Sequence, residues 1–114
     1  MATVTQKSVL DSVPTGLLIG GQWRDASGGK TLAVDDPATG EILIHVADAS
    51  IADGKAALDA AVAAQADWAR TAPRDRGELL RAAYEKITER ADEFAMLMTL
   101  EMGKTLAELS LIHI

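Results

Sequence analysis

The sequence predicts a small α/β chain in which short β hairpins come first and helices follow. Up to about residue 46, short apolar runs alternate with turn signals rich in glycine. From about residue 50, apolar residues recur at the three- and four-residue spacing of amphipathic helices. The 114 residues are 48% hydrophobic and 25% charged, which is typical of a folded domain rather than a disordered segment.

The first half contains four strand candidates, at residues 17–19, 22–24, 31–34 and 41–46. Gly20-Gly21 suits a hairpin turn that needs positive φ, and residues 26–29 form a second turn. Residues 36–40 contain a proline and a glycine, which are common in tight turns, so a third turn is predicted here. Residues 1–15, which are polar and mixed, are predicted to be a flexible tail.

The second half predicts about three helices. Ser50 is a plausible N-cap, with Asp53 in the capping-box position three residues later. Pro73 suits the first turn of the next helix, and the last runs over residues 92–102 until Gly103 caps it. In the first helix, one shared apolar face is predicted for Leu58, Ala61, Val62, Gln65 and Trp68. The predicted buried residues of the next two helices are Leu79, Leu80, Ala83 and Ile87, then Phe94, Leu97, Met98 and Met102.

Composition excludes several classes of function. A formal net charge of −6 argues against nucleic acid or an anionic membrane surface as a partner. The absence of cysteine excludes disulfides, thiolate metal sites and a cysteine nucleophile within this chain. The start lacks the pattern of a signal peptide and no apolar run reaches the length of a membrane span, so we expect a cytoplasmic protein.

The titratable candidates favour structural roles. His45 lies in a strand without a second histidine nearby, so we expect it to face solvent or to be hydrogen-bonded in the core. Four acidic residues of the helical half are expected to form a solvated helix face rather than a site. They are Glu89, Asp92, Glu93 and Glu101.

The glycine pairs and the serine and threonine hydroxyl groups are also interpreted as structural, because the residues around them do not fit a phosphate loop or a catalytic nucleophile. Gly20-Gly21 and Gly28-Gly29 precede strand candidates rather than helices, so they are hairpin turns and not phosphate loops. Lys104 lacks the upstream glycine spacing of such a loop. Ser50 and Thr71 have no visible base partner and are interpreted as caps. We therefore assign no catalytic, cofactor-binding or metal-binding residue.

An ordered set of short stretches resembles the opening of the aldehyde dehydrogenases. The stretches are Leu18-Ile19-Gly20-Gly21-Gln22-Trp23, Asp36-Pro37-Ala38-Thr39-Gly40-Glu41, residues 56–61 with Trp68, and residues 74–80, 87–93 and 98–104. Each is weak alone, but their order and spacing across residues 16–108 are distinctive. Asp36 and residues 97–104 are most similar to the succinate-semialdehyde branch.

This resemblance implies the N-terminal portion of a Rossmann-like cofactor domain in an enzyme that oxidises small aldehydes with NAD or NADP. In the family, a cysteine forms the thiohemiacetal, a glutamate activates water, and an asparagine with a backbone amide holds the oxyanion. All of these lie later in the chain than residue 108, so we expect an inactive fragment of a homo-oligomeric parent. Some members bind a monovalent cation near the positions of Val34, Asp35 and Glu101, but the other ligands are missing here.

The end of the chain departs from the family pattern. Thr105 replaces the usual proline, and residues 109–114 do not resemble the family. One back-translation of these six residues is a transposon-end adapter used in preparing sequencing libraries, so we predict that they are not biological. His113 is one of these residues, so we expect no functional role for it. The alternative is a small non-catalytic module that pairs with a full-length dehydrogenase subunit.

A truncated chain has a physical consequence for its apolar helix faces. Without the sheet formed by later residues, four side chains are expected to pair among themselves or to stay partly exposed. They are Leu79, Leu80, Leu97 and Met98. We therefore expect marginal stability or aggregation of the isolated chain.

Overall fold

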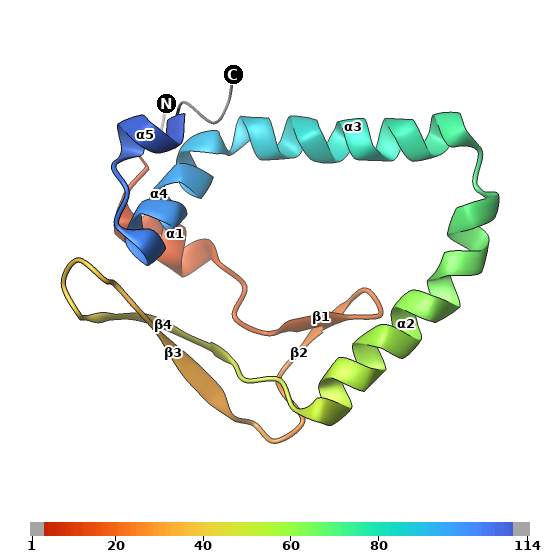
Figure 1. The fold of residues 1–114 in the computed structure, drawn as a ribbon, viewed down its shortest axis with the longest axis horizontal. Helices are drawn as coiled ribbons and strands as arrows, with labels where there is room; N and C mark the ends of the chain where they lie inside the picture. Colours follow the sequence, from red (N-terminus) through yellow and green to blue (C-terminus); the bar gives the residue numbers. More distant parts are fainter. Residues whose placement is uncertain (1–3, 111–114) are drawn as a thin grey trace. The chain divides into compact units, whose positions relative to one another are not determined.

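The computed structural model describes residues 4–110, which form two compact units. Within the described residues, unit 1 comprises residues 4–14, 33–45 and 84–110, and unit 2 comprises Thr15–Leu32 and Val46–Ala83. The order of elements is the predicted one, hairpins and then helices, with an additional short helix at each end (Figure 1).

The first hairpin of unit 2 confirms the predicted turn. β1 (Leu17–Ile19) pairs antiparallel with β2 (Gln22–Arg24), and Leu18 lies opposite Trp23. Gly20 and Gly21 have φ of +60° and +79°, the combination that a two-residue turn needs to match the twist of its strands. Side chains with a Cβ rarely adopt this conformation, so the glycine pair defines the register of the hairpin.

The second hairpin joins β3 (Thr31–Asp35) to β4 (Ile42–Ala47) as a separate two-stranded sheet. Its turn is closed by the Asp36 amide, which donates to the Glu41 carbonyl at 2.8 Å. The Asp36 side chain also accepts from the Ala38 amide at 2.8 Å, a local bond typical of aspartate in turns. The predicted turn at residues 36–40 is therefore confirmed.

Two long helices begin where the sequence predicts. α2 (Ile51–Arg70) starts with the Ser50–Asp53 capping box, in which each side chain accepts from the other residue's backbone amide. α2 ends at Thr71, whose amide donates to the carbonyls of Asp67 and Trp68. α3 (Pro73–Glu89) follows after one further residue, with proline in its first turn.

The core of unit 1 is small and is built by three helices. α1 (Gln6–Ser12) and α5 (Leu106–Ser110) both pack against α4 (Ala91–Met102). The apolar side chains buried there are Val9, Ala95, Leu100 and Leu109. Gly103 ends α4 in the left-handed conformation at φ +77°, as predicted, and its amide donates to Thr99.

Helix α1 corrects the sequence analysis, which places residues 6–12 in a flexible tail. Thr5 caps α1 by accepting from the Ser8 amide at 3.1 Å, and the Ser8 hydroxyl oxygen accepts from the Thr5 amide at 3.0 Å. This reciprocal pair does the work of a capping box with serine in place of the usual glutamate or glutamine. Because Val9 is buried, α1 contributes to the core of unit 1.

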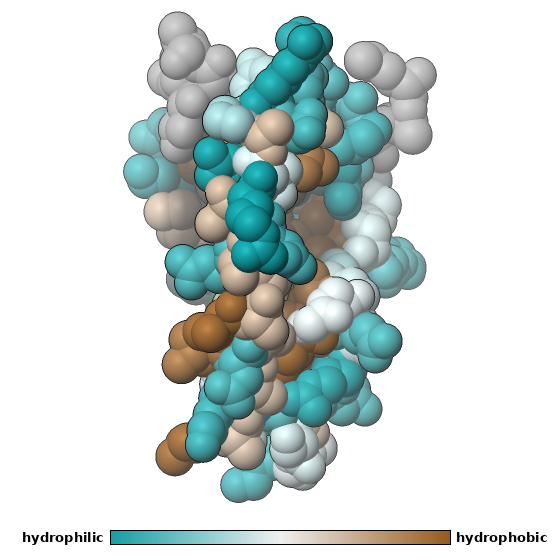
Figure 2. All heavy atoms as spheres, turned by 90° about the vertical axis from the view of Figure 1, so that its right-hand side faces the viewer, coloured by the Kyte–Doolittle hydropathy of each residue, from teal (hydrophilic) through white to brown (hydrophobic). Residues whose placement is uncertain are grey.

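The stripe predicted to be buried on α3 is exposed in this chain, so that prediction is wrong, and the apolar face predicted on α2 is exposed as well. The side chains that remain exposed include Leu58, Val62 and Trp68 on α2 and Leu79, Leu80 and Ile87 on α3. Of the residues of these two helices, only Asp53 is buried. On α4 the buried positions are Ala95 and Leu100, whereas Phe94 and Met102 are exposed. Figure 2 shows hydrophobic side chains on the surface beside hydrophilic ones.

This exposure agrees with the expectation for Leu79 and Leu80, and Leu97 and Met98 are half-buried. Burial requires a second apolar surface against the helix, and no residue of α3 is buried. The stripes are therefore faces without a partner in the part of the chain that the structure describes.

Candidate functional site

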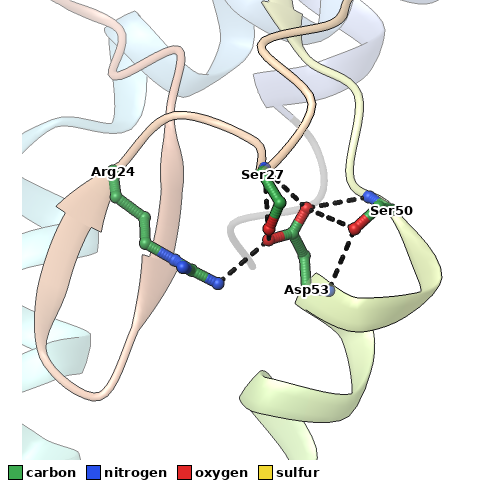
Figure 3. Close-up of polar contacts among 4 residues, drawn as sticks. All are labelled: Arg24, Ser27, Ser50 and Asp53. Atoms are coloured by element: carbon green, nitrogen blue, oxygen red, sulfur yellow. Dashed lines mark hydrogen bonds and ion pairs between the residues drawn. The ribbon is translucent and has the colours of Figure 1, made fainter.

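The best-defined polar constellation of unit 2 surrounds the carboxylate of Asp53. We call Arg24, Ser27, Ser50 and Asp53 the Asp53 cluster (Figure 3). Arg24 ends β2, Ser27 lies in the loop that follows it, and Ser50 and Asp53 lie at the start of α2. The cluster therefore joins the exit of the first hairpin to the N-terminus of a helix.

Five donor groups converge on the two carboxylate oxygens of Asp53. Oδ1 accepts from Arg24 Nη2 at 3.0 Å and from the Ser27 hydroxyl. Oδ2 accepts from the Ser27 amide at 3.0 Å, and from the Ser50 amide and hydroxyl, each at 2.9 Å. Asp53 is only 1% exposed, so these bonds replace the water that a free carboxylate would hold.

The donors stabilise the charged form of the carboxyl group. The Ser27 hydroxyl, followed by the backbone amides of Ser27 and Ser50, holds the pKa of Asp53 well below its usual range, although burial opposes this. Asp53 also lies at the N-terminus of α2, where the positive end of the helix dipole favours a negatively charged carboxylate. A carboxylate that is charged at neutral pH and saturated with donors is a poor proton acceptor, so the cluster is suited to structure rather than to acid–base chemistry.

The titratable residues considered from sequence behave as expected. His45 is exposed on β4. Glu89 pairs with Lys86 at 2.9 Å, and Glu93 pairs with Arg90 at 2.7 Å. The hydrogen bonds and negative charge of Glu93 raise the pKa of Arg90 above its ordinary value. The Glu89 and Glu93 side chains are 61% and 36% exposed, so both pairs are in contact with solvent.

The remaining candidates do not assemble into a site. Val34 is half-buried, Asp35 and Glu101 are exposed, and residues 4–110 contain no group of three acidic or histidine side chains arranged to hold a metal. Ser50 and Thr71 act as caps, as predicted. His113 lies outside the described residues. No helix within residues 4–110 is long and apolar enough to span a bilayer.

The sequence pattern identifies two of the four residues of the Asp53 cluster. The Ser50–Asp53 spacing identifies the capping box, but Ser27 and Arg24 lie 26 and 29 residues from Asp53. The aspartate at position 53 could have indicated a contact with another loop, because the third position of a capping box usually carries glutamate or glutamine. A shorter side chain there keeps its carboxylate close to the helix start, within reach of donors from a neighbouring loop.

Comparison with known proteins gives a consistent assignment. Residues 23–113 match the aldehyde dehydrogenase family. Over 67 residues the chain is 58% identical to a succinate-semialdehyde dehydrogenase of Paenarthrobacter nicotinovorans. This aligned stretch covers 59% of this chain and 15% of that protein.

Solved structures agree in fold over most of the chain. A betaine aldehyde dehydrogenase from Staphylococcus aureus in complex with NAD+ superposes with a TM-score of 0.85 and 28% identity, covering 91% of this chain and 22% of that one. An NADP dependent enzyme from E. coli superposes with a TM-score of 0.81 and 38% identity, covering 83% and 20%. The chain thus spans only about a fifth or less of the length of these proteins. Its hairpins and helices match the N-terminal region of the aldehyde dehydrogenase fold, and the chain belongs to the aldehyde dehydrogenase family.

Proposed function

We propose that this chain is the N-terminal structural portion of an NAD(P)-dependent aldehyde dehydrogenase whose substrate is succinate semialdehyde, and that the chain alone is not catalytic. The observation that carries the substrate is the 58% identity to a succinate-semialdehyde dehydrogenase. The family mechanism needs a cysteine nucleophile, and the sequence of this chain has no cysteine. The cofactor proposal is supported by the NAD+ complex among the structural relatives.

The role that we assign to the chain is architectural. The Asp53 cluster fixes the start of α2 to the first hairpin, while α2 and α3 present leucine, valine and tryptophan side chains outward. Exposed apolar faces of this kind commonly mark surfaces that another part of a protein covers. In the complete enzyme, which we propose to be a cytoplasmic homo-oligomer, these faces would pack against the sheet that later residues of the cofactor domain form.

The first test is an activity assay of the 114-residue chain with succinate semialdehyde and either NAD+ or NADP+. We expect no formation of reduced nicotinamide above the rate without protein, because no residue of the chain can form the thiohemiacetal. The full-length succinate-semialdehyde dehydrogenase that resembles the chain serves as the positive control. An aldehyde-dependent rate from the chain alone would overturn the assignment of an inactive segment.

The alternative is a non-catalytic module that pairs with a full-length dehydrogenase subunit. The exposed side chains of α2 and α3 are the observation in its favour. Size-exclusion chromatography of the chain mixed with the full-length dehydrogenase separates the two proposals. Co-elution at a defined ratio supports the module, and separate elution supports the segment.

The origin of residues 109–114 stays a prediction. The family match runs to residue 113, and Leu109 is buried in unit 1, whereas residues 111–114 lie outside the described part of the chain. Sequencing the genomic locus beyond the codon for Glu108 decides this point. Family-like codons in place of the adapter sequence would support the proposed tail, and an uninterrupted genomic frame encoding residues 109–114 would contradict it.

A further inference from the structure

The sequence contains a single aspartate that is followed directly by glycine, at Asp53–Gly54. In such a pair the backbone nitrogen of the glycine can attack the side-chain carboxyl carbon of the aspartate. A nitrogen–carbon bond forms, the amide proton and the carboxyl hydroxyl leave together as water, and the two residues close into a succinimide ring. Water then opens the ring at the former main-chain carbonyl, which gives an isoaspartyl linkage. Glycine hinders the attack least, because it has no side chain.

Both reacting groups of this pair are held apart in folded unit 2. The Gly54 amide donates to the Ser50 carbonyl at 3.1 Å, as a helical hydrogen bond of the first turn of α2. The Asp53 carboxylate is 1% exposed and is fixed by donors from Ser27, among others (Figure 3). The nitrogen can reach the carboxyl carbon only after the backbone of this turn rotates and these bonds break.

The charge of the Asp53 carboxyl group also opposes ring closure. The neutral acid loses its hydroxyl group as water, whereas a carboxylate has no comparable leaving group. The hydroxyl and the amide of Ser27 hold the pKa of Asp53 well below its usual range, so the neutral acid is rare at neutral pH. The same donors therefore restrain the carboxyl group in position and keep it in its unreactive form.

We propose that Asp53–Gly54 is a covalent modification site, where isoaspartate forms once the Asp53 cluster is broken and where the intact cluster suppresses the reaction. The modification is one-way for unit 2. An isoaspartyl linkage adds a methylene group to the backbone within the first turn of α2, and the former side-chain carboxyl carbon becomes part of the chain. The capping box with Ser50 and the bonds from Ser27 then lose the carboxylate that they bind.

The structure offers a variant that removes the reactive pair and keeps the cluster. Gly54 is exposed on α2, an added Cβ there would meet open space, and Gly54 is not among the glycines with positive φ. Alanine is also a better helix residue than glycine. Gly54→Ala should therefore preserve the fold of unit 2, while its methyl group hinders attack by the nitrogen.

The test follows isoaspartate in the 114-residue chain at neutral pH, with and without guanidinium chloride. Trypsin releases residues 31–55 as one peptide, in which electron-transfer fragmentation distinguishes the two isomers of equal mass. We expect the folded parent to react at least about tenfold more slowly than the denatured parent, because such a reaction follows the population of the open state. Ser27→Ala should react at least about threefold faster than the folded parent, since it lacks one donor to the carboxylate.

Thr71→Ala is the matched control, because the Thr71 hydroxyl donates to the Asp67 carbonyl at 3.0 Å, at the other end of α2. It should react at the rate of the folded parent, and Gly54→Ala should suppress the product in both conditions. In denaturant, Ser27→Ala should match the parent. Equal rates of the parent with and without denaturant would overturn the proposal, as would an acceleration in Thr71→Ala as large as that in Ser27→Ala.

Discussion

Leu100→Ala should lower the free energy of unfolding of unit 1 by about 2–5 kcal/mol. Leu100 is 3% exposed on α4, in the core that also contains Val9 and Leu109. The substitution removes buried methyl groups and leaves a cavity that the short helices α1 and α5 can fill only by moving. Because unit 1 buries few large side chains, this loss is a large fraction of its stability.

Urea denaturation followed by far-ultraviolet circular dichroism measures this effect. Leu80→Ala is the matched control, because Leu80 lies on α3 and is 68% exposed. The control should change stability by no more than about 0.5 kcal/mol, as is usual for surface positions. Equal losses in the two variants would mean that the core of unit 1 contributes no more than an exposed helix face.

Asp53→Asn should destabilise unit 2 strongly at neutral pH. The asparagine amide has one acceptor oxygen where the carboxylate has two, so the donors of Ser27 and Ser50 and the charge of Arg24 lose partners at a buried position. We expect the midpoint of thermal unfolding to fall by roughly 5 °C or more. Asp67→Asn is the control, because the Asp67 side chain pairs with Arg70 on α2 and is 86% exposed.

The same variant gives a pH dependence with a definite sign. The pKa of Asp53 is lowered in the folded state, so its charged form stabilises the fold fully above the unfolded pKa of about 3.9. This contribution is lost as the pH falls from that value toward the lower folded pKa. The difference in midpoint between the parent and Asp53→Asn should therefore shrink below about pH 4. A difference that stays constant there would show that the carboxylate charge is not what stabilises unit 2.

Local signals in the sequence predict most of the elements. The glycine pair of the first turn, the Ser50–Asp53 box and Gly103 each act within a few residues, and the structure confirms all three. Helix α1 was not predicted, because its capping box has Ser8 at the position where glutamate or glutamine is usual.

Features that depend on distant parts of the chain were harder to predict. Helical spacing shows that the side chains of α3 share a face, but not whether anything covers that face, and Leu79 and Leu80 are exposed. On α4 the apolar residues surround most of the helix, so spacing alone did not select Leu100 over Phe94. The contribution of Ser27 to the Asp53 cluster likewise depends on the path of the chain between them.

The wide spacing within the Asp53 cluster also bears on how fast the chain folds. The capping box needs only the three-residue step from Ser50 to Asp53, whereas Ser27 meets Asp53 across 26 residues. Closing that loop costs chain entropy before any bond compensates for it, so helix initiation at Ser50 should precede capture of the Ser27 loop. A contact formed after the transition state leaves the folding rate nearly unchanged and slows unfolding. We therefore predict that loss of the Ser27–Asp53 bonds speeds the unfolding of unit 2 more than it slows its folding.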